Sequence, residues 1–347
     1  MFKIHDRIIS VDQPPYIIAE LSANHGGSIE AAKLAIDRAK LSGADAVKIQ
    51  SYTPDTMTIE SNMPDFQITD GLWSGYTLYD LYKEAHTPFA WHQELFDYAR
   101  QQEITLFSTP FDETAVDMLK SLNAPAYKIA SFEIIDLPLI KKVAMCGRPL
   151  LISTGMANFN EIKEAVQVAL KYGCGDILLF HCISNYPTPV QESNLRNLTF
   201  LKSNFGVEVG LSDHSLSNVA AISSIALGAT AIEKHFKPDG SSTGPDASFS
   251  LNPTQFKSLV SDCHDAWHAL GNNGFNRSVT EEASIKYRRS VYFTSDLNSG
   301  DKISSNDIRI IRPGFGLAPK FYDGLIGKTV TRDVVRGQPV SLDCIEE

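Results

Sequence analysis

Eight short apolar runs recur along the chain, and each ends in polar side chains that are able to do chemistry. Segments with the periodicity of a helix separate the runs. Strand and helix alternating eight times predict a (β/α)8 TIM barrel, an α/β fold whose active site lies where the strands end. The expected strands cover residues 16–21, 46–50, 105–110, 126–131, 149–155, 177–182, 207–214 and 231–236.

The chain is longer than one barrel needs. A barrel of this type takes about 250 residues, and the chain has 347. After the alternation stops, short strands separated by Gly, Asn and Pro are expected at 290–293, 307–311 and 329–330. We therefore expect three parts, the last of them a small β-rich module that is too short to be very stable alone. These parts are a barrel domain over 1–272, a linker over 273–288 and the module over 289–347.

Residues with capping side chains indicate where several helices begin. Asp112 is expected to cap a helix over 113–122. Asn160 is expected to open a helix over 161–172, and one long helix is expected over 253–270 after the last strand.

Composition limits the partners and the compartment. The net charge is −10, and nucleic acid or an anionic membrane needs a cationic surface, so we expect neither as a partner. We find no signal-peptide pattern at the amino terminus and no run of about 18 apolar residues, so no membrane span is expected. Five cysteines without CxxC spacing are typical of a reduced cytoplasmic protein. Cys182 ends a strand and is a candidate nucleophile, although an isolated cysteine is more often a small core residue.

Two histidines end neighbouring strands. His214 and His235 follow the seventh and eighth apolar runs, so both side chains can reach one point above the barrel. Imidazole is a common ligand of Mn²⁺, Zn²⁺ and Fe²⁺. The spacing fits a metal site and equally fits two histidines hydrogen-bonded to polar groups of the barrel. Asp246 follows the eighth strand and either supplies a carboxylate near the same point or lies in a surface loop.

Two lysines end the second and fourth strands. Burying Lys48 or Lys128 costs free energy unless the ammonium group meets an anion or a carboxylate. Four hydroxyl groups at other strand ends could join the lysines in binding a phosphate and a carboxylate: Thr109, Ser131, Ser153 and Ser212. Two alternatives stay open at this point. The lysines could pair with carboxylates, for which Glu20, Glu133 and Glu233 are candidates, or one could form a Schiff base, as in barrel aldolases.

The ordered motifs at the strand ends resemble those of the sialic acid synthases, over nearly the whole chain. The matching segments are 19–27, 47–50, 107–112, 127–131, 153–156, 181–182, 186–189, 210–214, 233–236 and 244–246. The resemblance implies an enzyme that condenses phosphoenolpyruvate with an N-acetylated aldose to form a nine-carbon keto acid. An inactive sugar-binding homologue is disfavoured, because the lysines and histidines of the family are all present.

The resemblance also implies a role for each candidate residue. His214 and His235 are expected to hold a divalent metal, with Mn²⁺ favoured over Mg²⁺ or Co²⁺. The expected phosphoenolpyruvate ligands are Lys48, Thr109, Lys128, Ser131, Ser153, Ser184 and Ser212. The catalytic candidates are Glu20, Glu133, Tyr186 and Asp246, and the sugar-binding candidates are Gln50, Tyr186, Asp246 and Arg312.

The carboxyl-terminal module resembles the antifreeze-like (SAF) domain of the same family. The match includes residues 312–317, with the sequence Arg-Pro-Gly-Phe-Gly-Leu. In that family the module reaches over the barrel of a partner in a domain-swapped homodimer, and the arginine of this motif contacts the acetamido group of the sugar. Arg312 is the matching residue, so a homodimer is expected.

The long connection after Gln50 narrows the resemblance further. It runs nearly forty residues, a length typical of lids and binding loops, and it is rich in aromatic residues. Residues 70–73 and 77–85 resemble the pseudaminic acid synthases, whose sugar is 2,4-diacetamido-2,4,6-trideoxy-L-altrose. A synthase of N-acetylneuraminate or legionaminate is the alternative, and a Schiff-base aldolase is a more distant one. Ser184 departs from the asparagine of the sialic acid synthases, and a shorter side chain leaves room in the sugar pocket.

Overall fold

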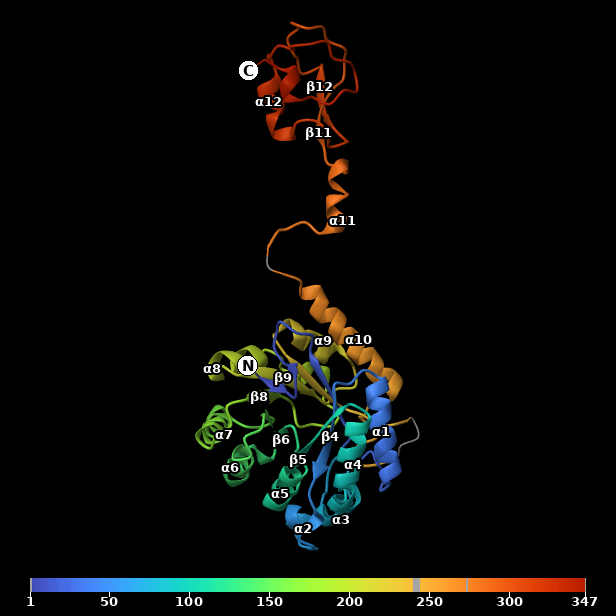
Figure 1. Ribbon diagram of the computed structural model, residues 1–347, viewed down its shortest axis with the longest axis vertical. Helices are drawn as coiled ribbons and strands as arrows, with labels where there is room; N and C mark the ends of the chain where they lie inside the picture. The colour runs from blue at the N-terminus through green and yellow to red at the C-terminus, as the bar shows by residue number, and fades with distance from the viewer. Residues whose placement is uncertain (1, 240–243, 273, 347) are drawn as a thin grey trace. The chain divides into compact units, whose positions relative to one another are not determined.

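The structure is a computed structural model that describes residues 2–239, 244–272 and 274–346 (Figure 1). Residue 273, the first of the expected linker, lies outside the described residues. Contacts divide the chain into two compact units, Met1–Gly271 and Asn272–Glu347.

The first unit is built on a closed barrel of eight parallel strands, which confirms the fold expected from the sequence. Around the barrel the order is β10-β3-β4-β5-β6-β7-β8-β9. Each strand lies within or overlaps one of the eight apolar runs, because strands with both faces covered need continuous apolar sequence. The strands are β3 (Tyr16–Glu20), β4 (Ala46–Ser51), β5 (Thr105–Pro110), β6 (Tyr127–Ile129), β7 (Leu150–Ser153), β8 (Ile177–His181), β9 (Glu208–Asp213) and β10 (Ala231–His235).

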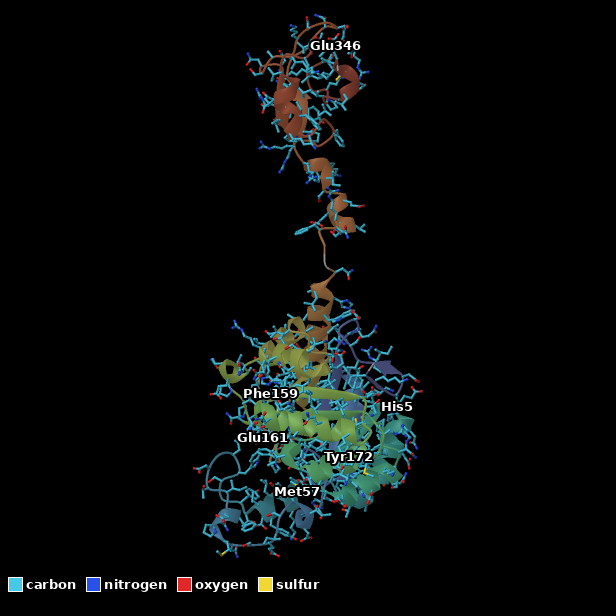
Figure 2. All side chains as sticks on the ribbon, turned by 90° about the vertical axis from the view of Figure 1, so that its left-hand side faces the viewer. His5, Met57, Phe159, Glu161, Tyr172 and Glu346 are labelled. Carbon is cyan, nitrogen blue, oxygen red and sulfur yellow. The ribbon has the colours of Figure 1, made fainter. Side chains whose placement is uncertain are left out.

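Helices surround the barrel (Figure 1). The longest, α10, begins at the Asn252 cap and covers the range expected from the sequence. In Figure 2, Phe159 and Tyr172 mark the two ends of the α7 segment. The helices are α1 (Ile29–Leu41), α2 (Pro54–Met57), α3 (Leu78–Ala85), α4 (Phe89–Gln101), α5 (Glu113–Ser121), α6 (Leu137–Ala144), α7 (Phe159–Lys171), α8 (Asn197–Phe205), α9 (Val219–Ala226) and α10 (Pro253–Leu270), with short 3-10 turns at Pro64–Phe66, Glu133–Ile135 and Val190–Glu192.

Of the two helix starts assigned to capping residues, one is confirmed and one is wrong. The carboxylate of Asp112 accepts hydrogen bonds from the first turn of α5, as expected. The start of α7 is not Asn160 but Asn158, whose side chain accepts from the backbone of Asn160 and Glu161. Asn158 is the cap because its backbone N–H donates to the Glu161 carboxylate at 2.8 Å. This bond completes a capping box that Asn160 cannot form.

A short hairpin plugs the inside of the barrel. Strands β1 (Lys3–Ile4) and β2 (Arg7–Ile8) form it, and buried Phe2, Ile4 and Ile9 join the side chains that fill the barrel interior. That interior cluster includes Tyr16, Ala46 and Ala231, the first residues of their strands. The hairpin therefore closes the amino-terminal end of the barrel, and the carboxyl ends of the strands are left for a site. A separate core lies between the strands and the helices.

The second unit is a small β-rich module. Strands β11 (Ser290–Phe293) and β12 (Ile308–Ile311) pair antiparallel, and the unit also contains α11 (Val279–Glu282), α12 (Tyr322–Leu325) and 3-10 turns at Ile285–Tyr287, Pro319–Phe321 and Leu342–Cys344. The strand expected at 329–330 is reduced to isolated bridges with Lys302 and Ile345. The end of the expected linker is already part of this unit, because Gly314 N donates to Lys286 O at 2.9 Å.

Gly210 of β9 is a position where the barrel leaves no room for a side chain. A Cβ there would lie 2.6 Å from the ring of Phe180 and 2.7 Å from the carbonyl oxygen of Ala231. We expect Gly210→Ala to lower the free energy of unfolding by roughly 1–3 kcal/mol, the usual cost of overpacking. Gly175→Ala is the matched control, since nothing lies within 4 Å of its Cβ. Equal urea-denaturation midpoints for the two variants would contradict this account.

Candidate active site

A cavity of about 580 Å³ opens at the carboxyl ends of the barrel strands. It brings together every site residue expected in the first unit, although these come from seven different strands and from the connections that follow barrel strands, including the one after β8. The residues from the sequence that line it are Glu20, Lys48, Gln50, Thr109, Lys128, Ser131, Glu133, Ser153, Ser184, Tyr186, Ser212, His214, His235 and Asp246. Arg312 belongs to the second unit.

Two lysines share one carboxylate at the bottom of this cavity. Glu233 Oε1 lies 2.9 Å from Lys48 Nζ and 3.4 Å from Lys128 Nζ, and it also accepts from Ser212 Oγ at 2.9 Å. Lys48 Nζ is in addition 3.3 Å from Glu20 Oε2. The side chains of both lysines and both glutamates are at most 6% exposed. Glu233 entered the sequence analysis only as a possible ion-pair partner, and the structure places it at the centre.

Burial and charge set the ionisation of this cluster. Burial opposes the charge of Glu233, but Lys128 and Lys48 outweigh it and hold the pKa of that carboxyl well below its usual value. Burial lowers the pKa of Lys128 to about 8 although Glu233 is beside it. The pKa of Lys48 is raised, because Glu20 and Glu233 together outweigh its burial. Burial raises the pKa of Glu20 to about 7. The cluster therefore gains net positive charge whenever Glu20 takes up a proton.

Hydroxyl groups and a glycine form a small cradle beside the lysines. Ser131 Oγ and Ser184 Oγ are 2.8 Å apart. Gly155, at a φ of +46°, faces them so closely that a Cβ would lie 2.4 Å from Ser131 Cβ. Among the described residues, the buried Thr109 Oγ1 has no hydrogen-bond partner, and Ser153 Oγ has only the thiol of Cys182 near it. Buried hydroxyls without partners are expected where a ligand supplies the missing acceptor.

The two histidines lie close together in the lining of the cavity. Their ring centroids are 5.5 Å apart. The Nδ1 of His214 donates to the carbonyl of Ile183 at 2.8 Å, which leaves its Nε2 as a lone-pair donor, and His235 Nδ1 has no partner within the described residues. Burial lowers the pKa of His214 to about 4 and that of His235 well below its usual value. Both rings are thus neutral at pH 7, the form that binds metal.

The surroundings of the histidines fit a catalytic rather than a closed structural metal. In the part of the chain that the structure describes, no group of three or more His, Cys, Asp and Glu is arranged to hold an ion. Two imidazoles therefore supply only part of a coordination sphere, and open positions are what a metal needs to bind substrate. Tyr186 covers one side of the pair, with its ring centroid 4.3 Å from that of His214.

Ser22 links three of the expected polar residues, and sequence reasoning missed it. Its hydroxyl donates to Asp246 Oδ2 and accepts from Gln50 Nε2 at 2.9 Å, while the same amide reaches Glu20 Oε1 at 3.2 Å. Ser22 has a φ of +45°, a strained conformation for a residue other than glycine, and such strain is common at functional sites. The signals in the sequence were its position two residues after Glu20 and its place in the matching segment 19–27. Burial raises the pKa of Asp246.

The long connection after β4 forms an apolar wall of the cavity. Trp73 Nε1 donates to the carbonyl of Pro245 at 3.0 Å, and its ring centroid lies 6.1 Å from that of Tyr186. Tyr52 packs edge-on against Tyr82 at 5.9 Å. Met57, labelled in Figure 2, marks this connection and lines the cavity. Further lining residues from the same connection are Ile68, Leu72, Leu78 and Leu81.

Burial of the Glu133 carboxyl disfavours its ionised form, and the effect on stability can be measured. Burial raises its pKa to about 7, with a smaller contribution from Asp136 in the same direction, against which Lys128 acts only weakly. The carboxyl is therefore neutral in the folded protein below about pH 7, and the stability that this provides is lost as the pH rises through that value.

We expect Glu133→Gln, which stays neutral, to become more stable than the native protein as the pH rises from 5 to 8.5. The expected gain at the upper end is on the order of 1 kcal/mol. Denaturation of both proteins across this pH range measures it, with Glu164→Gln at an exposed position of α7 as a control. A constant stability difference between native protein and Glu133→Gln over the whole range would contradict the shifted pKa.

No helix among the described residues is long and apolar enough to cross a membrane. All five cysteines are free thiols.

Comparisons with known proteins identify the family to which the chain is similar. Residues 35–274 match the NeuB family and residues 288–346 match the SAF domain. The chain is 40% identical to the pseudaminic acid synthase of Helicobacter pylori over 336 residues, covering 96% of this chain and 98% of that protein. It is 41% identical to the pseudaminic acid synthase of Campylobacter jejuni, covering 94% and 96%.

A solved structure shares the architecture. The N-acetylneuraminic acid (sialic acid) synthetase of Leptospira borgpetersenii, in complex with citrate, superposes with a TM-score of 0.71 and 30% identity. The match covers 79% of this chain and 91% of that one. Family models that match residues 35–274 and 288–346, together with relatives aligned over almost the whole chain, confirm the resemblance found in the sequence. The chain belongs to the NeuB family of sialic acid synthases and carries a carboxyl-terminal SAF domain.

Proposed function

We propose that this protein is a pseudaminic acid synthase. It is a transferase that condenses phosphoenolpyruvate with 2,4-diacetamido-2,4,6-trideoxy-L-altrose and water to give pseudaminic acid and phosphate. The observation that carries the proposal is the pair of buried ammonium groups beside unpartnered hydroxyls, in a cavity that also holds two neutral imidazoles. Identity of about 40% to curated pseudaminic acid synthases supports the choice of sugar.

Phosphoenolpyruvate would bind at the lysines. Its phosphate and carboxylate are anions. The ammonium groups of Lys48 and Lys128 would attract them more strongly in this buried site than in water, because the local dielectric constant is lower. Hydroxyl groups of the cradle would donate the remaining hydrogen bonds: Thr109, Ser131, Ser153 and Ser184. Ser212 would join this site after turning its proton from Glu233 Oε1 to the ligand. Fixing the enol so that its C3 faces the aldehyde would supply much of the rate enhancement through positioning.

A divalent metal would be held by His214 and His235, whose neutral rings suit it. His235 Nδ1 has no partner within the described residues, and His214 Nε2 has only Ser212 Oγ near it, at 3.5 Å. When bound, it would polarise the carbonyl oxygen of the open-chain sugar. Mn²⁺ is the ion that we favour, with Mg²⁺ and Co²⁺ as alternatives, because oxygen ligands from substrate and water would complete the sphere.

The carbon chemistry needs groups that hold and move protons. The C3 of phosphoenolpyruvate attacks the aldehyde carbon, water adds at C2, and the resulting tetrahedral intermediate loses phosphate by cleavage of its C–O bond. Glu20 and Glu133, each with a pKa of about 7, can exchange protons near neutral pH. Asp246, fixed by Ser22 beside Gln50, would orient the sugar and the attacking water together with Tyr186.

The wall formed by the long connection suits the proposed aldose. A sugar with a C6 methyl and two acetamido groups is more apolar than N-acetylmannosamine, and aromatic side chains bind such groups well. Trp73, Tyr82 and Leu81 supply this surface. Ser184 leaves space that a longer side chain would fill. An N-acetylneuraminate or legionaminate synthase is the alternative within the family.

The remaining expectations concern assembly and location. We propose that residues 273–288 link the barrel domain over 1–272 to the SAF domain over 289–347. We also propose that the protein is a domain-swapped homodimer in which Arg312 binds the sugar in the partner's barrel, as the resemblance implies. The free thiols are typical of a reducing compartment, so we place the enzyme in the cytoplasm.

A phosphate-release assay tests the proposed reaction. The protein is incubated with phosphoenolpyruvate, Mn²⁺ and one aldose at a time, including the precursors of pseudaminate, legionaminate and N-acetylneuraminate. We expect kcat/KM to be highest with 2,4-diacetamido-2,4,6-trideoxy-L-altrose, and we expect no release after EDTA treatment or from Lys128→Met. Lys142→Met, which removes an exposed lysine paired with Asp117, is the matched control.

Three other results would change or reject the proposed function. Preference for another aldose would assign the alternative synthase. No phosphate release with any sugar would reject the synthase. Borohydride trapping of a pyruvate adduct on a lysine would assign a Schiff-base aldolase instead.

A further inference from the structure

A second buried ion pair lies on the opposite side of the same two strands from the cavity. Side chains alternate along a strand, so Ser212 and Glu233 point into the barrel while their neighbours Asp213 and Lys234 point outward. Lys234 Nζ lies 2.6 Å from Asp213 Oδ2, and these side chains are only 1% and 3% exposed. Asp213 directly precedes His214, and Lys234 directly precedes His235.

The pair sits where the two strands separate. In the register of β9 and β10 the last partners are Asp213 and Lys234. One residue further on, His235 is partnered with Glu20 of β3 and not with His214. Backbone pairing therefore does not hold the two histidines together directly. The ion pair is the last link between the strands before their metal-facing residues.

The same two side chains also hold the turn that carries His214. Asp213 Oδ1 accepts a hydrogen bond from Ser215 N at 2.9 Å. Lys234 Nζ donates to Ser217 O at 3.0 Å. The turn after β9 is thus attached to the aspartate of its own strand and to the lysine of the next strand, from the side that the cavity does not reach.

We propose that Asp213 and Lys234 are positioning residues that set the spacing of His214 and His235 for one metal ion. The inference rests on the proposed metal site. Two ligands on different strands bind one ion well only if their backbone positions are fixed, and groups behind the ligands commonly control affinity in this way.

A contribution to the stability of the fold does not explain why an ion pair, and not apolar side chains, is buried here. Removing two charges from water is costly, and apolar side chains of similar volume often replace a buried ion pair without loss of stability. A directional link at 2.6 Å, with two further hydrogen bonds to one turn, instead selects a single geometry. The proposed benefit is therefore the geometry of the histidines.

The test compares Mn²⁺ binding in variants that keep or remove this link. Asp213→Leu combined with Lys234→Met replaces the pair by apolar side chains of similar size. Asp117→Leu combined with Lys142→Met removes an exposed ion pair between α5 and α6 and is the matched control. Calorimetry and the electron paramagnetic resonance signal of free Mn²⁺ report affinity, urea denaturation reports stability, and phosphoenolpyruvate binding without metal reports the rest of the cavity.

We expect the Asp213–Lys234 double variant to bind Mn²⁺ at least about tenfold more weakly. Its binding of phosphoenolpyruvate without metal should be unchanged, and the control should bind Mn²⁺ as the native protein does. A folded double variant with native Mn²⁺ affinity would overturn the proposal. So would an equal loss of both affinities, because that result indicates general damage to the barrel.

Asp213→Asn covers the case in which the double variant does not fold. It keeps an acceptor for Ser215 N but loses the charge that holds Lys234, so weaker Mn²⁺ binding is again expected and native affinity would again overturn the proposal. The native protein separates this inference from the function on which it rests. Absence of Mn²⁺ binding to the native protein would reject the metal site itself, and the positioning role with it.

Discussion

One carboxylate, that of Glu233, contacts two lysine side chains inside the barrel. Without Glu233, the ammonium groups of Lys48 and Lys128 would repel each other in a place that water barely reaches. With it, the barrel can hold cationic groups beside unpartnered hydroxyls, although the chain as a whole carries a net charge of −10. The apolar hairpin plug at the other end of the barrel leaves the strand ends as the place where these groups can meet a ligand. The phosphoenolpyruvate site that we propose depends on this arrangement.

The cavity divides into regions with different physical properties. The charged cluster lies among strand ends, where the backbone is held by parallel pairing on both sides. The apolar wall comes from the long connection after β4, anchored by Trp73 to Pro245. The histidines line the same cavity, and the ring of Tyr186 is tilted against that of His214. In barrel enzymes the strand ends commonly hold the charged groups and the connecting segments form the rest of the site. Loops can vary in sequence without disturbing the strands.

The barrel and most of the site could be predicted from the sequence, because strand ends in a barrel converge whatever the connections do. Lys48, Lys128, His214 and His235 were found in this way, before any contact was known. The central place of Glu233 could not be found, since sequence spacing does not say which of three carboxylates lies between two lysines. Ser22 was missed because its bond to Asp246 joins it to a loop more than 200 residues away, and its left-handed backbone is not marked by a glycine. The start of α7 was misplaced by two residues because Asn158 and Asn160 are both good caps, and only the reciprocal bond with Glu161 decides between them.

The pH dependence of phosphoenolpyruvate binding tests the charged cluster most directly. Lys128, with a pKa lowered to about 8, loses its proton as the pH rises through that value, while Lys48, held by Glu20 and Glu233, keeps its own. The ligand's phosphate, with a second pKa of about 6, is already fully ionised in this range. Calorimetry of the metal-free protein should therefore show affinity that falls steadily between about pH 8 and pH 9.5, above the pH at which Glu20 and Glu133 ionise. Lys128→Arg, which cannot lose its charge, should give a flat profile over the same range. A flat profile for the native protein would contradict the account.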